Sequence, residues 1–192
     1  MIDYSVISLN ELLSHENIDE EKLVNSFRKF SCSKEKDLED FLVKSAIHYE
    51  LIEFGKTFLI IDNEELKNGH LEIAAFFTIG QVSVDISNLS QKQKKKLLGS
   101  VPGRDRMTSF PAFLIGQLGR NDKYNKIQLP GSVIIEECRS RLEAAQIIVG
   151  GKLVILECRE ALQAFYTAQH FKKLSEINDK GLYTYYKRLD TW

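Results

Sequence analysis

Tyr166 is the residue of this chain whose type and position point most directly to chemistry. It follows Phe165 in a segment with helical apolar spacing, and Phe171 begins an extended stretch shortly afterwards. A phenol has a pKa near ~10, which makes it a proton donor suited to a leaving thiolate of pKa ~8.5. The alternative is a helix tyrosine that packs its ring in the core. The apolar run at residues 154–156 predicts a buried strand just before this helix.

A polar loop at residues 119–132 is the second feature with chemical meaning. Its order is strand end, polar loop and helix start, and backbone N–H groups at a helix start bind anionic diphosphates. Lys123 and Lys126 add positive charge, and Gly131 permits close approach of a ligand to the backbone. An ordinary strand-to-helix connection is the alternative interpretation.

Together these segments resemble the GNAT (GCN5-related) N-acetyltransferases. In that family a Phe-Tyr pair precedes a Gly-Phe by three residues, and the tyrosine protonates the thiolate of coenzyme A. Here the pair is Phe165-Tyr166, and His170-Phe171 replaces the Gly-Phe. The resemblance therefore implies that Tyr166 is the catalytic acid of an acetyl transfer from acetyl-coenzyme A.

The resemblance also implies the residues that hold acetyl-coenzyme A. The family's diphosphate pattern is Arg/Gln-x-x-Gly-x-Gly/Ala, and Asn125, Gln128 and Pro130 occupy its three defined positions, so both small residues are replaced. Arg159 stands where many relatives carry an Asn that faces the pantetheine arm. The implied pantetheine contacts are the backbone groups of Leu118, Gly119 and Arg120. The implied diphosphate contacts are Lys123, Asn125, Lys126, Ile127, Gln128, Pro130, Gly131 and Ser132.

Two further segments resemble one branch of the family, the GNAT toxins that acetylate aminoacyl-tRNA. The first runs from Phe30 and Cys32 to Leu38, Leu42 and Ala46, and the second covers residues 74–79. Their simplest physical role is core packing. The resemblance indicates a lineage and leaves the acceptor open.

Composition narrows the possible classes of protein. A net charge of −1 and a pI near 6.4 provide no overall field for nucleic acid, which disfavours a nucleic-acid partner without excluding a local basic patch at residues 92–106. Three scattered cysteines indicate reduced thiols and a cytoplasmic protein, and isolated histidines indicate no metal site. No apolar run reaches the ~20 residues of a membrane span.

The periodicity predicts an α+β fold, GNAT-like, with a largely antiparallel sheet flanked by helices. Predicted strands cover residues 4–8, 57–62, 71–85, 109–118, 154–156 and 181–189, and those at 57–62 and 71–79 are predicted to form a hairpin. Predicted helices cover residues 19–27, 38–49, 131–148 and 161–168, with a short basic helix and a mobile loop within 87–106. Ser33 is predicted as an N-cap, Gly55 as a helix end and Ile148 as part of a buried helix face. One domain is expected over residues 1–192, with 1–29 a less certain N-terminal extension.

The resulting hypothesis is direct transfer of an acetyl group to an amine, since no cysteine stands at a plausible nucleophile position. Glu72 and Asp85 are the nearest candidates for a general base, and nothing in the sequence singles out either. The acceptor is a small molecule or the amino group of aminoacyl-tRNA, the latter as a bacterial toxin with an antitoxin partner. A homodimer is a further possible partner state. A non-catalytic GNAT-like interaction module is the alternative from another class.

Overall fold

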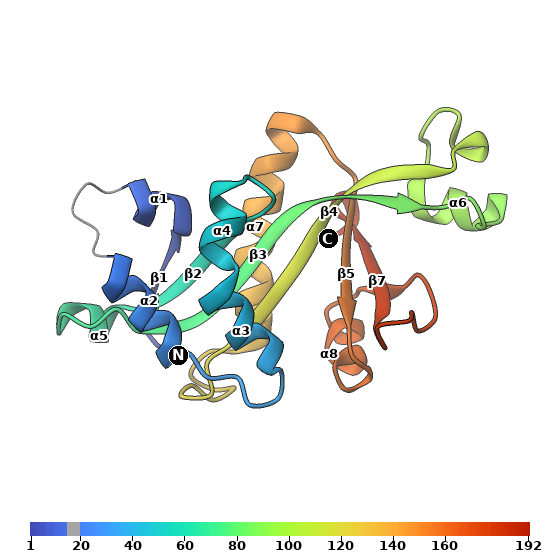
Figure 1. Cartoon of the computed structure of the whole chain (residues 1–192). Helices are drawn as coiled ribbons and strands as arrows, with labels where there is room; N and C mark the ends of the chain where they lie inside the picture. The colour runs from blue at the N-terminus through green and yellow to red at the C-terminus, as the bar shows by residue number, and fades with distance from the viewer. Residues whose placement is uncertain (15–19) are drawn as a thin grey trace. The chain divides into compact units, whose positions relative to one another are not determined.

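The computed structural model describes residues 1–14 and 20–192, which form a mixed α+β structure around one sheet (Figure 1). The strand order is β1-β2-β3-β4-β5-β7-β6. The pairs β1–β2, β2–β3, β5–β7 and β6–β7 are antiparallel, whereas β4 and β5 are parallel. The predicted fold class is therefore confirmed. The strands are β1 (Tyr4–Ser8), β2 (Lys56–Asp62), β3 (Ile73–Asp85), β4 (Ser109–Arg120), β5 (Leu153–Cys158), β6 (Lys172–Lys173) and β7 (Tyr183–Arg188).

The helices agree with the periodicity at most positions and add short elements that it did not indicate. They are α1 (Leu9–Ser14), α2 (Glu20–Lys29), α3 (Lys36–Lys44), α4 (Ala46–Leu51), α5 (Asn63–Lys67), α6 (Gln91–Leu98), α7 (Gly131–Val149) and α8 (Gln163–Ala168). Three 3₁₀ turns cover Arg104–Arg106, Glu160–Leu162 and Leu189–Thr191. The predicted helix start at residue 19 lies outside the described residues. No described helix is both long and apolar enough to cross a membrane.

The contacts divide into two compact units. The first unit comprises Met1–Ile79 with Gly116–Ser140, and the second comprises Gly80–Ile115 with Arg141–Trp192. The prediction of one domain over residues 1–192 stays a prediction.

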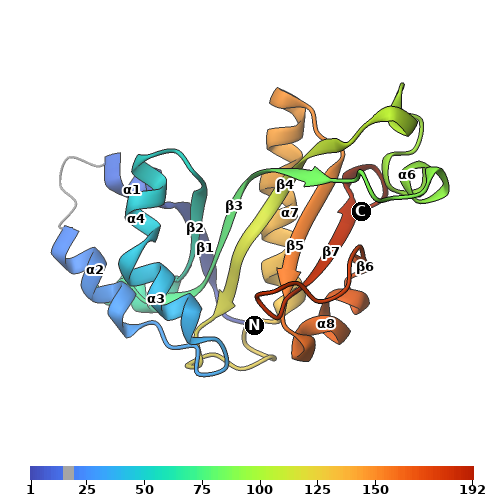
Figure 2. The same cartoon turned by 45° about the vertical axis from the view of Figure 1, so that its right-hand side comes forward.

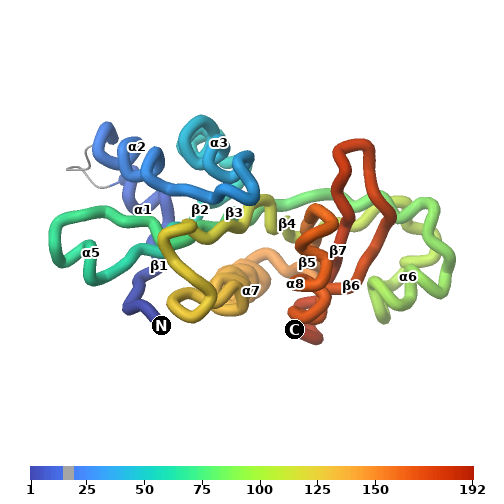
Figure 3. The backbone as a smooth tube through the Cα atoms, turned by 90° about the horizontal axis from the view of Figure 1, so that it is seen from below, coloured from blue at the N-terminus to red at the C-terminus, as the bar shows by residue number. Residues whose placement is uncertain are grey.

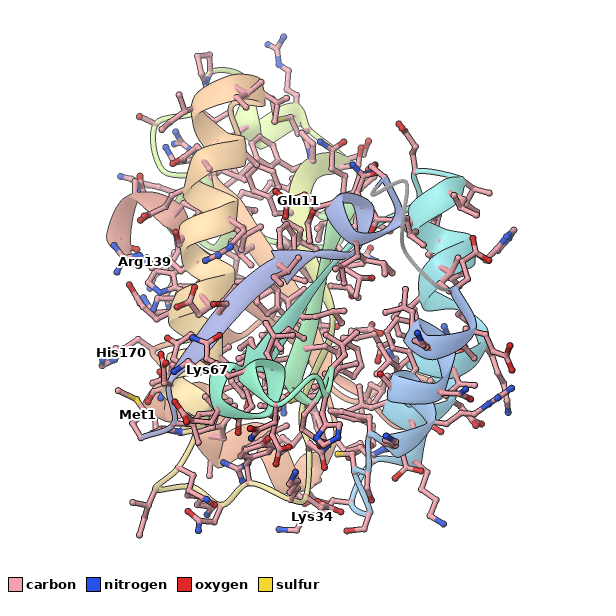
Figure 4. The ribbon with its side chains drawn as sticks, turned by 90° about the vertical axis from the view of Figure 1, so that its left-hand side faces the viewer. Met1, Glu11, Lys34, Lys67, Arg139 and His170 are labelled. Carbon is pink, nitrogen blue, oxygen red and sulfur yellow. The ribbon has the colours of Figure 1, made fainter. Side chains whose placement is uncertain are left out.

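The first unit is built on the β2–β3 hairpin, which confirms the predicted pairing. The register runs from Lys56↔Ile79 to Ile61↔Ile73, with an irregularity between Ile60 and Ile61. Figure 3 shows α2 and α3 on one side of these strands and the first half of α7 on the other, and Figure 4 shows the same layering through Arg139 on α7. The core between the strands and α1–α4 contains the fully buried Phe27, Leu42 and Phe76.

Three helix predictions in this unit are wrong. Ser33 is not an N-cap: α3 begins at Lys36, its N-cap position is Glu35 without a side-chain bond, and the Ser33 N–H donates to Asp122 instead (2.7 Å). The helix predicted over residues 38–49 is two helices, because Ser45 has a φ of −124° and turns the chain between α3 and α4. Helix α4 also ends at Leu51, before the predicted end at Gly55.

The second unit has β5 at its centre, paired with β4 on one side and with β7 on the other. Its core includes Ile86, Leu97 and Leu153, all nearly inaccessible to solvent. Ile148 is not on a buried face as predicted but is 82% exposed. The last fully buried residue of α7 is Leu142, so burial ends about two turns before the helix does.

Candidate active site

Tyr166 lies on α8, in a C-terminal cap whose geometry explains the spacing of the motif. The helix ends at Ala168, His170 has a φ of +63°, and the Phe171 N–H donates to the Tyr166 carbonyl (3.0 Å). The His170 N–H donates to the Thr167 carbonyl (2.9 Å). These two bonds form a Schellman motif, in which the residue after the left-handed position packs on the helix three residues from its end. Tyr166 and Phe171 make that contact, edge to face, with ring centroids 5.8 Å apart.

The same cap explains what the family's glycine does and what His170 does in its place. The position requires a positive φ, which glycine adopts without a steric penalty and which histidine adopts only at a cost in free energy. Tyr166 itself is buried, at 6% exposure, and its ring also meets Phe165 edge to face at 5.0 Å. The phenol is therefore held by aromatic neighbours on both sides along the chain.

The end of β4 offers a strand edge for a linear ligand. The pairing of β4 with β5 runs from Phe113↔Val154 to Ile115↔Leu156, whereas β4 itself continues to Arg120. The Gln117 N–H donates to the Thr78 hydroxyl (2.8 Å). A Cβ on Gly119 would lie 2.7 Å from Leu38 Cδ1, so the absence of a side chain here lets Leu38 of α3 pack closely against β4. Gly119 thus has a structural role that the sequence did not reveal.

The loop after β4 is anchored at its start by two residues that the sequence did not single out. Asn121 is 2% exposed, and its side-chain amide donates to the Ile73 carbonyl (3.0 Å). Asp122 accepts from the Ser33 N–H (2.7 Å), and its own N–H donates to the Ser31 carbonyl (2.7 Å). The hydrogen bond from the Ser33 N–H is the main reason why the pKa of Asp122 is lower than usual. The toxin-like segment around Cys32 therefore fixes the loop in place.

Two of the predicted diphosphate contacts use their side chains inside the loop. Asn125 Oδ1 accepts from the N–H groups of Ile127 (2.8 Å) and Gln128 (3.0 Å), and Gln128 Oε1 accepts from the Asn125 N–H (3.0 Å). Arg120 donates to the Leu129 carbonyl (2.9 Å) and so closes the loop. These backbone donors are satisfied internally, which distinguishes the loop from a glycine-rich cradle with open N–H groups.

Lys123 is engaged with carboxylates. Its ammonium lies 3.0 Å from Glu65 Oε1 and 3.4 Å from Glu72 Oε2, and the bond to Glu65 is the main cause that raises its pKa. The neighbouring Tyr124, which the sequence did not single out, is buried and donates its hydroxyl to Asp62 (2.9 Å), and burial raises its pKa. Both residues secure the loop against the segment that runs from the end of β2 through α5 to the start of β3.

The donors that fit a diphosphate lie at the start of α7. This helix is 19 residues long and begins at Gly131, after Pro130, which has no N–H group. The first N–H groups of a helix have no partner within it, so those of Gly131 and Ser132 suit an anion. Lys126 and Ile127 are exposed in the loop that precedes this helix. The residues present therefore fit a phosphate group at this helix start, with fewer backbone donors than the family pattern provides.

The remaining predicted residues are Arg159, Glu72 and Asp85, and the two carboxylates are engaged in other bonds. Arg159 is exposed in the second unit, where it precedes the Glu160–Leu162 turn. Glu72 is bonded to Lys123, and Asp85 accepts from Ser87, which lowers its pKa and makes it a weaker base. The described residues contain no group of three metal-ligating side chains. Cys32, Cys138 and Cys158 are buried and form no disulfide, and burial raises the pKa of Cys158 to about 11.

Comparison with known proteins shows a fold and no close sequence relative. No family model and no curated protein match the sequence. A structure of AtaT complexed with acetyl-methionyl-tRNAfMet is 16% identical, with a TM-score of 0.72 over 98% of this chain and 96% of that one. A tyrosine-to-phenylalanine mutant of KacT is 15% identical, with a TM-score of 0.72 over 98% and 96% of the two chains.

A third neighbour is a tyrosine-to-phenylalanine mutant of the AtaT toxin bound to acetyl-CoA and to the C-terminus of the antitoxin AtaR. It is 13% identical, with a TM-score of 0.69 over 98% of this chain and 95% of that one. The likeness extends over nearly the whole length of every chain compared. The protein therefore has the GNAT-like fold of the toxins AtaT and KacT.

Proposed function

We propose that this protein is an N-acetyltransferase that moves the acetyl group of acetyl-coenzyme A directly to an amine. The amine nitrogen attacks the acetyl carbonyl, a C–N bond forms and the C–S bond breaks. The Tyr166 hydroxyl gives its proton to the departing thiolate, the amine loses a proton to solvent, and the resulting tyrosinate takes up a proton from solvent. This acid suits the step because the thiol of coenzyme A is more acidic than the phenol by only about 1–2 pKa units.

The observation that carries the proposal is the capped helix that holds Tyr166. A Schellman motif with Tyr166 and Phe171 in contact gives a structural reason for the whole spacing that resembles the family. The neighbours in fold include an acetyl-CoA complex, and a tyrosine is the residue replaced in the AtaT and KacT mutants. These findings support a tyrosine-dependent acetyl transfer.

Acetyl-coenzyme A would be held by two backbone features of the first unit. The edge of β4 at residues 116–120 suits the amides of a pantetheine arm, which pair like another strand. The N–H groups of Gly131 and Ser132 suit the diphosphate, with Lys126 nearby as a cation. Direct transfer is favoured over an acyl-cysteine intermediate, since the three thiols are buried and the pKa values of Cys32 and Cys158 are raised.

The test combines calorimetric titration with acetyl-coenzyme A and an assay for thiol release with charged tRNA and a panel of amines. Tyr166→Phe is expected to keep its affinity for acetyl-coenzyme A and to lower kcat by roughly 10²–10⁴-fold. Gly131→Glu is expected to abolish binding, because a carboxylate would face the diphosphate. Tyr183→Phe is the matched control, since it removes a hydroxyl from β7 in the same unit.

Two outcomes would overturn the proposal. Absence of acetyl-coenzyme A binding by the wild type would favour the non-catalytic interaction module instead. Full activity of Tyr166→Phe would remove the tyrosine from the chemistry even if binding were present.

A second candidate acceptor is the amino group of aminoacyl-tRNA, as in a toxin. It is favoured by the AtaT complex with acetyl-methionyl-tRNAfMet and by exposed lysines on α6. An antitoxin that binds this chain would accompany such an activity, as AtaR binds AtaT. Acetylation of charged tRNA, with no transfer to uncharged tRNA or to free amino acids, would establish this acceptor. Transfer to small amines alone would exclude it.

A further inference from the structure

Helix α8 is too short to be stable by itself. It has six residues, whereas isolated helices below ~12–15 residues are marginal in water. The Schellman motif closes its C-terminus but does not fix the helix to the rest of the second unit. The orientation of the Tyr166 hydroxyl must therefore depend on tertiary contacts.

Helix α8 lies close to β7 (Figure 2), and two side chains of β7 contact the two ends of this helix. The Tyr185 hydroxyl donates to Oε1 of Gln163, the first residue of α8 (3.0 Å). The Lys187 ammonium donates to the carbonyl of Gln169, the residue just after the last turn (2.9 Å). Tyr185 and Lys187 are two apart on one strand and so project from the same face of it.

The contact at the C-terminal end is reinforced by aromatic rings. The Lys187 ammonium lies 4.4 Å from the Trp192 ring centroid and 5.5 Å from that of Phe171, and Phe171 meets Trp192 edge to face at 5.3 Å. Lys187 is only 7% exposed, and these rings and the carbonyl help to stabilise its buried charge. A cation is also favourable at a helix C-terminus. Side-chain contacts thus run without a gap from Trp192 through Lys187 and Phe171 to Tyr166.

We propose that Tyr185 and Lys187 are positioning residues for the acetyl transfer. They clamp α8 at both ends, Trp192 seats Lys187 against Phe171, and the Tyr166 hydroxyl keeps one orientation as a result. The inference rests on the proposed function and assigns to β7 a role in catalysis without contact with the substrates.

The test measures acetyl-CoA-dependent thiol release by the full chain, with methionyl-tRNA and a simple amine as acceptor probes. Lys187→Met keeps most of the side-chain volume and is expected to lower kcat about 10-fold or more, with KM for acetyl-coenzyme A changed by less than about twofold, because a displaced acid loses rate rather than affinity. Tyr185→Phe, which removes one hydroxyl, is expected to lower kcat by about threefold. Lys173→Met is the matched control, since Lys173 lies over the Tyr183 ring and pairs with Glu176.

A double-mutant cycle separates positioning from a merely structural effect. If Lys187 acts through Tyr166, Lys187→Met is expected to cause no further loss of rate in a Tyr166→Phe background. Equal loss in both backgrounds, or equal loss in Lys173→Met, would overturn the inference.

Amide hydrogen exchange tests the clamp without any activity. Lys187→Met is expected to lower the protection of the His170 and Phe171 N–H groups at least 10-fold, because the cap opens more often. Unchanged protection would overturn the clamp alone. Absence of thiol release by the wild type would instead overturn the proposed function, so the two failures are distinguishable.

Discussion

At the scale of single residues, the motif around Tyr166 is a solution to helix termination. Tyr166 and Phe171 have the spacing that a Schellman motif imposes on its apolar contact, and His170 occupies the left-handed position between them. The chemistry attributed to the tyrosine therefore coincides with a structural demand on its neighbours. A substitution at His170 tests the structural demand alone, because it leaves Tyr166 unchanged.

His170→Gly is expected to stabilise the protein by about 0.5–1 kcal/mol. Glycine relieves the strain of a φ of +63°, and part of the gain is lost to the greater entropy of the unfolded chain. Urea denaturation is the measurement, and the midpoint is expected to rise with an unchanged slope. Gln169→Gly, in the same turn at a φ of −85°, is the control and is expected to destabilise. Equal effects of the two substitutions would contradict this account.

At this scale the sequence was sufficient to place Tyr166 on a helix that ends before Phe171, because the pattern that indicates this is local. It did not allow the state of the loop side chains to be predicted. Asn125 and Gln128 look like open polar contacts in the sequence, yet their side chains bond to backbone N–H groups two or three residues away. Lys123 looks like a cation for phosphate, yet it meets Glu65, which is distant in sequence. Long-range pairing of this kind has no periodic signal.

At the scale of elements, the loop between β4 and α7 is secured by Asp122 to the segment ahead of α3. The bond from Ser33 lowers the pKa of Asp122 below its ordinary value of 3.8. A folded pKa below the unfolded one means that the unfolded chain binds more protons in that window. The stabilisation is therefore complete above about pH 4 and is lost as pH falls through the folded pKa.

Asp122→Asn is expected to lower the urea midpoint at pH 7. Below about pH 4 the difference between wild type and variant is expected to disappear, because the wild type loses the stabilisation by the Asp122 charge. The exposed Asp179→Asn, in another loop, is the control and is expected to follow the wild type across the range. A constant difference between wild type and Asp122→Asn from pH 7 to pH 3 would show that the Asp122 charge is not responsible.

The connection between α7 and β5 contains two adjacent glycines, which differ in the space available for a side chain. Gly150 has a φ of +73° and open space around it, whereas a Cβ on Gly151, at a φ of +124°, would collide with the Phe113 ring. Gly150→Ala is expected to cost about 1 kcal/mol through strain alone. Gly151→Ala is expected to cost about 3 kcal/mol, because strain and overpacking add. Thermal unfolding of both variants checks this order, and equal losses would contradict the packing argument.

Strand and helix order was predictable because β2 and β3 contain continuous apolar runs and α7 has helical apolar spacing. The break at Ser45 was not, since the apolar positions of α3 and α4 continue one helical pattern across it. The exposure of Ile148 was not predictable either, because periodicity identifies a face but not how far the core extends beneath it.

At the scale of the whole molecule, the net charge of −1 conceals an uneven distribution. Helix α6 carries four lysines, and its capping box at Ser90 and Gln93 fixes its start. Lys94 is only 6% exposed and donates to the Met107 carbonyl (2.6 Å), so it supports the fold rather than a surface. The exposed cations of α6 are Lys92, Lys95 and Lys96, and Arg106 in the following turn is exposed too.

If the acceptor is charged tRNA, these three exposed lysines are expected to contact its phosphates. Replacing Lys92, Lys95 and Lys96 together by Glu is expected to weaken tRNA binding at least 10-fold and to reduce the slope of log K against log salt by about 2–3, because each phosphate contact releases bound counterions. Filter binding across a salt series measures both quantities. The same charge change at Lys29, Lys34 and Lys36, which are also exposed, is the control for net charge. Equal losses in the two triple variants would mean that overall charge, and not the α6 surface, governs binding. An unchanged slope in the α6 variant would exclude that helix as the tRNA contact and leave acetyl transfer to small amines as the activity to pursue.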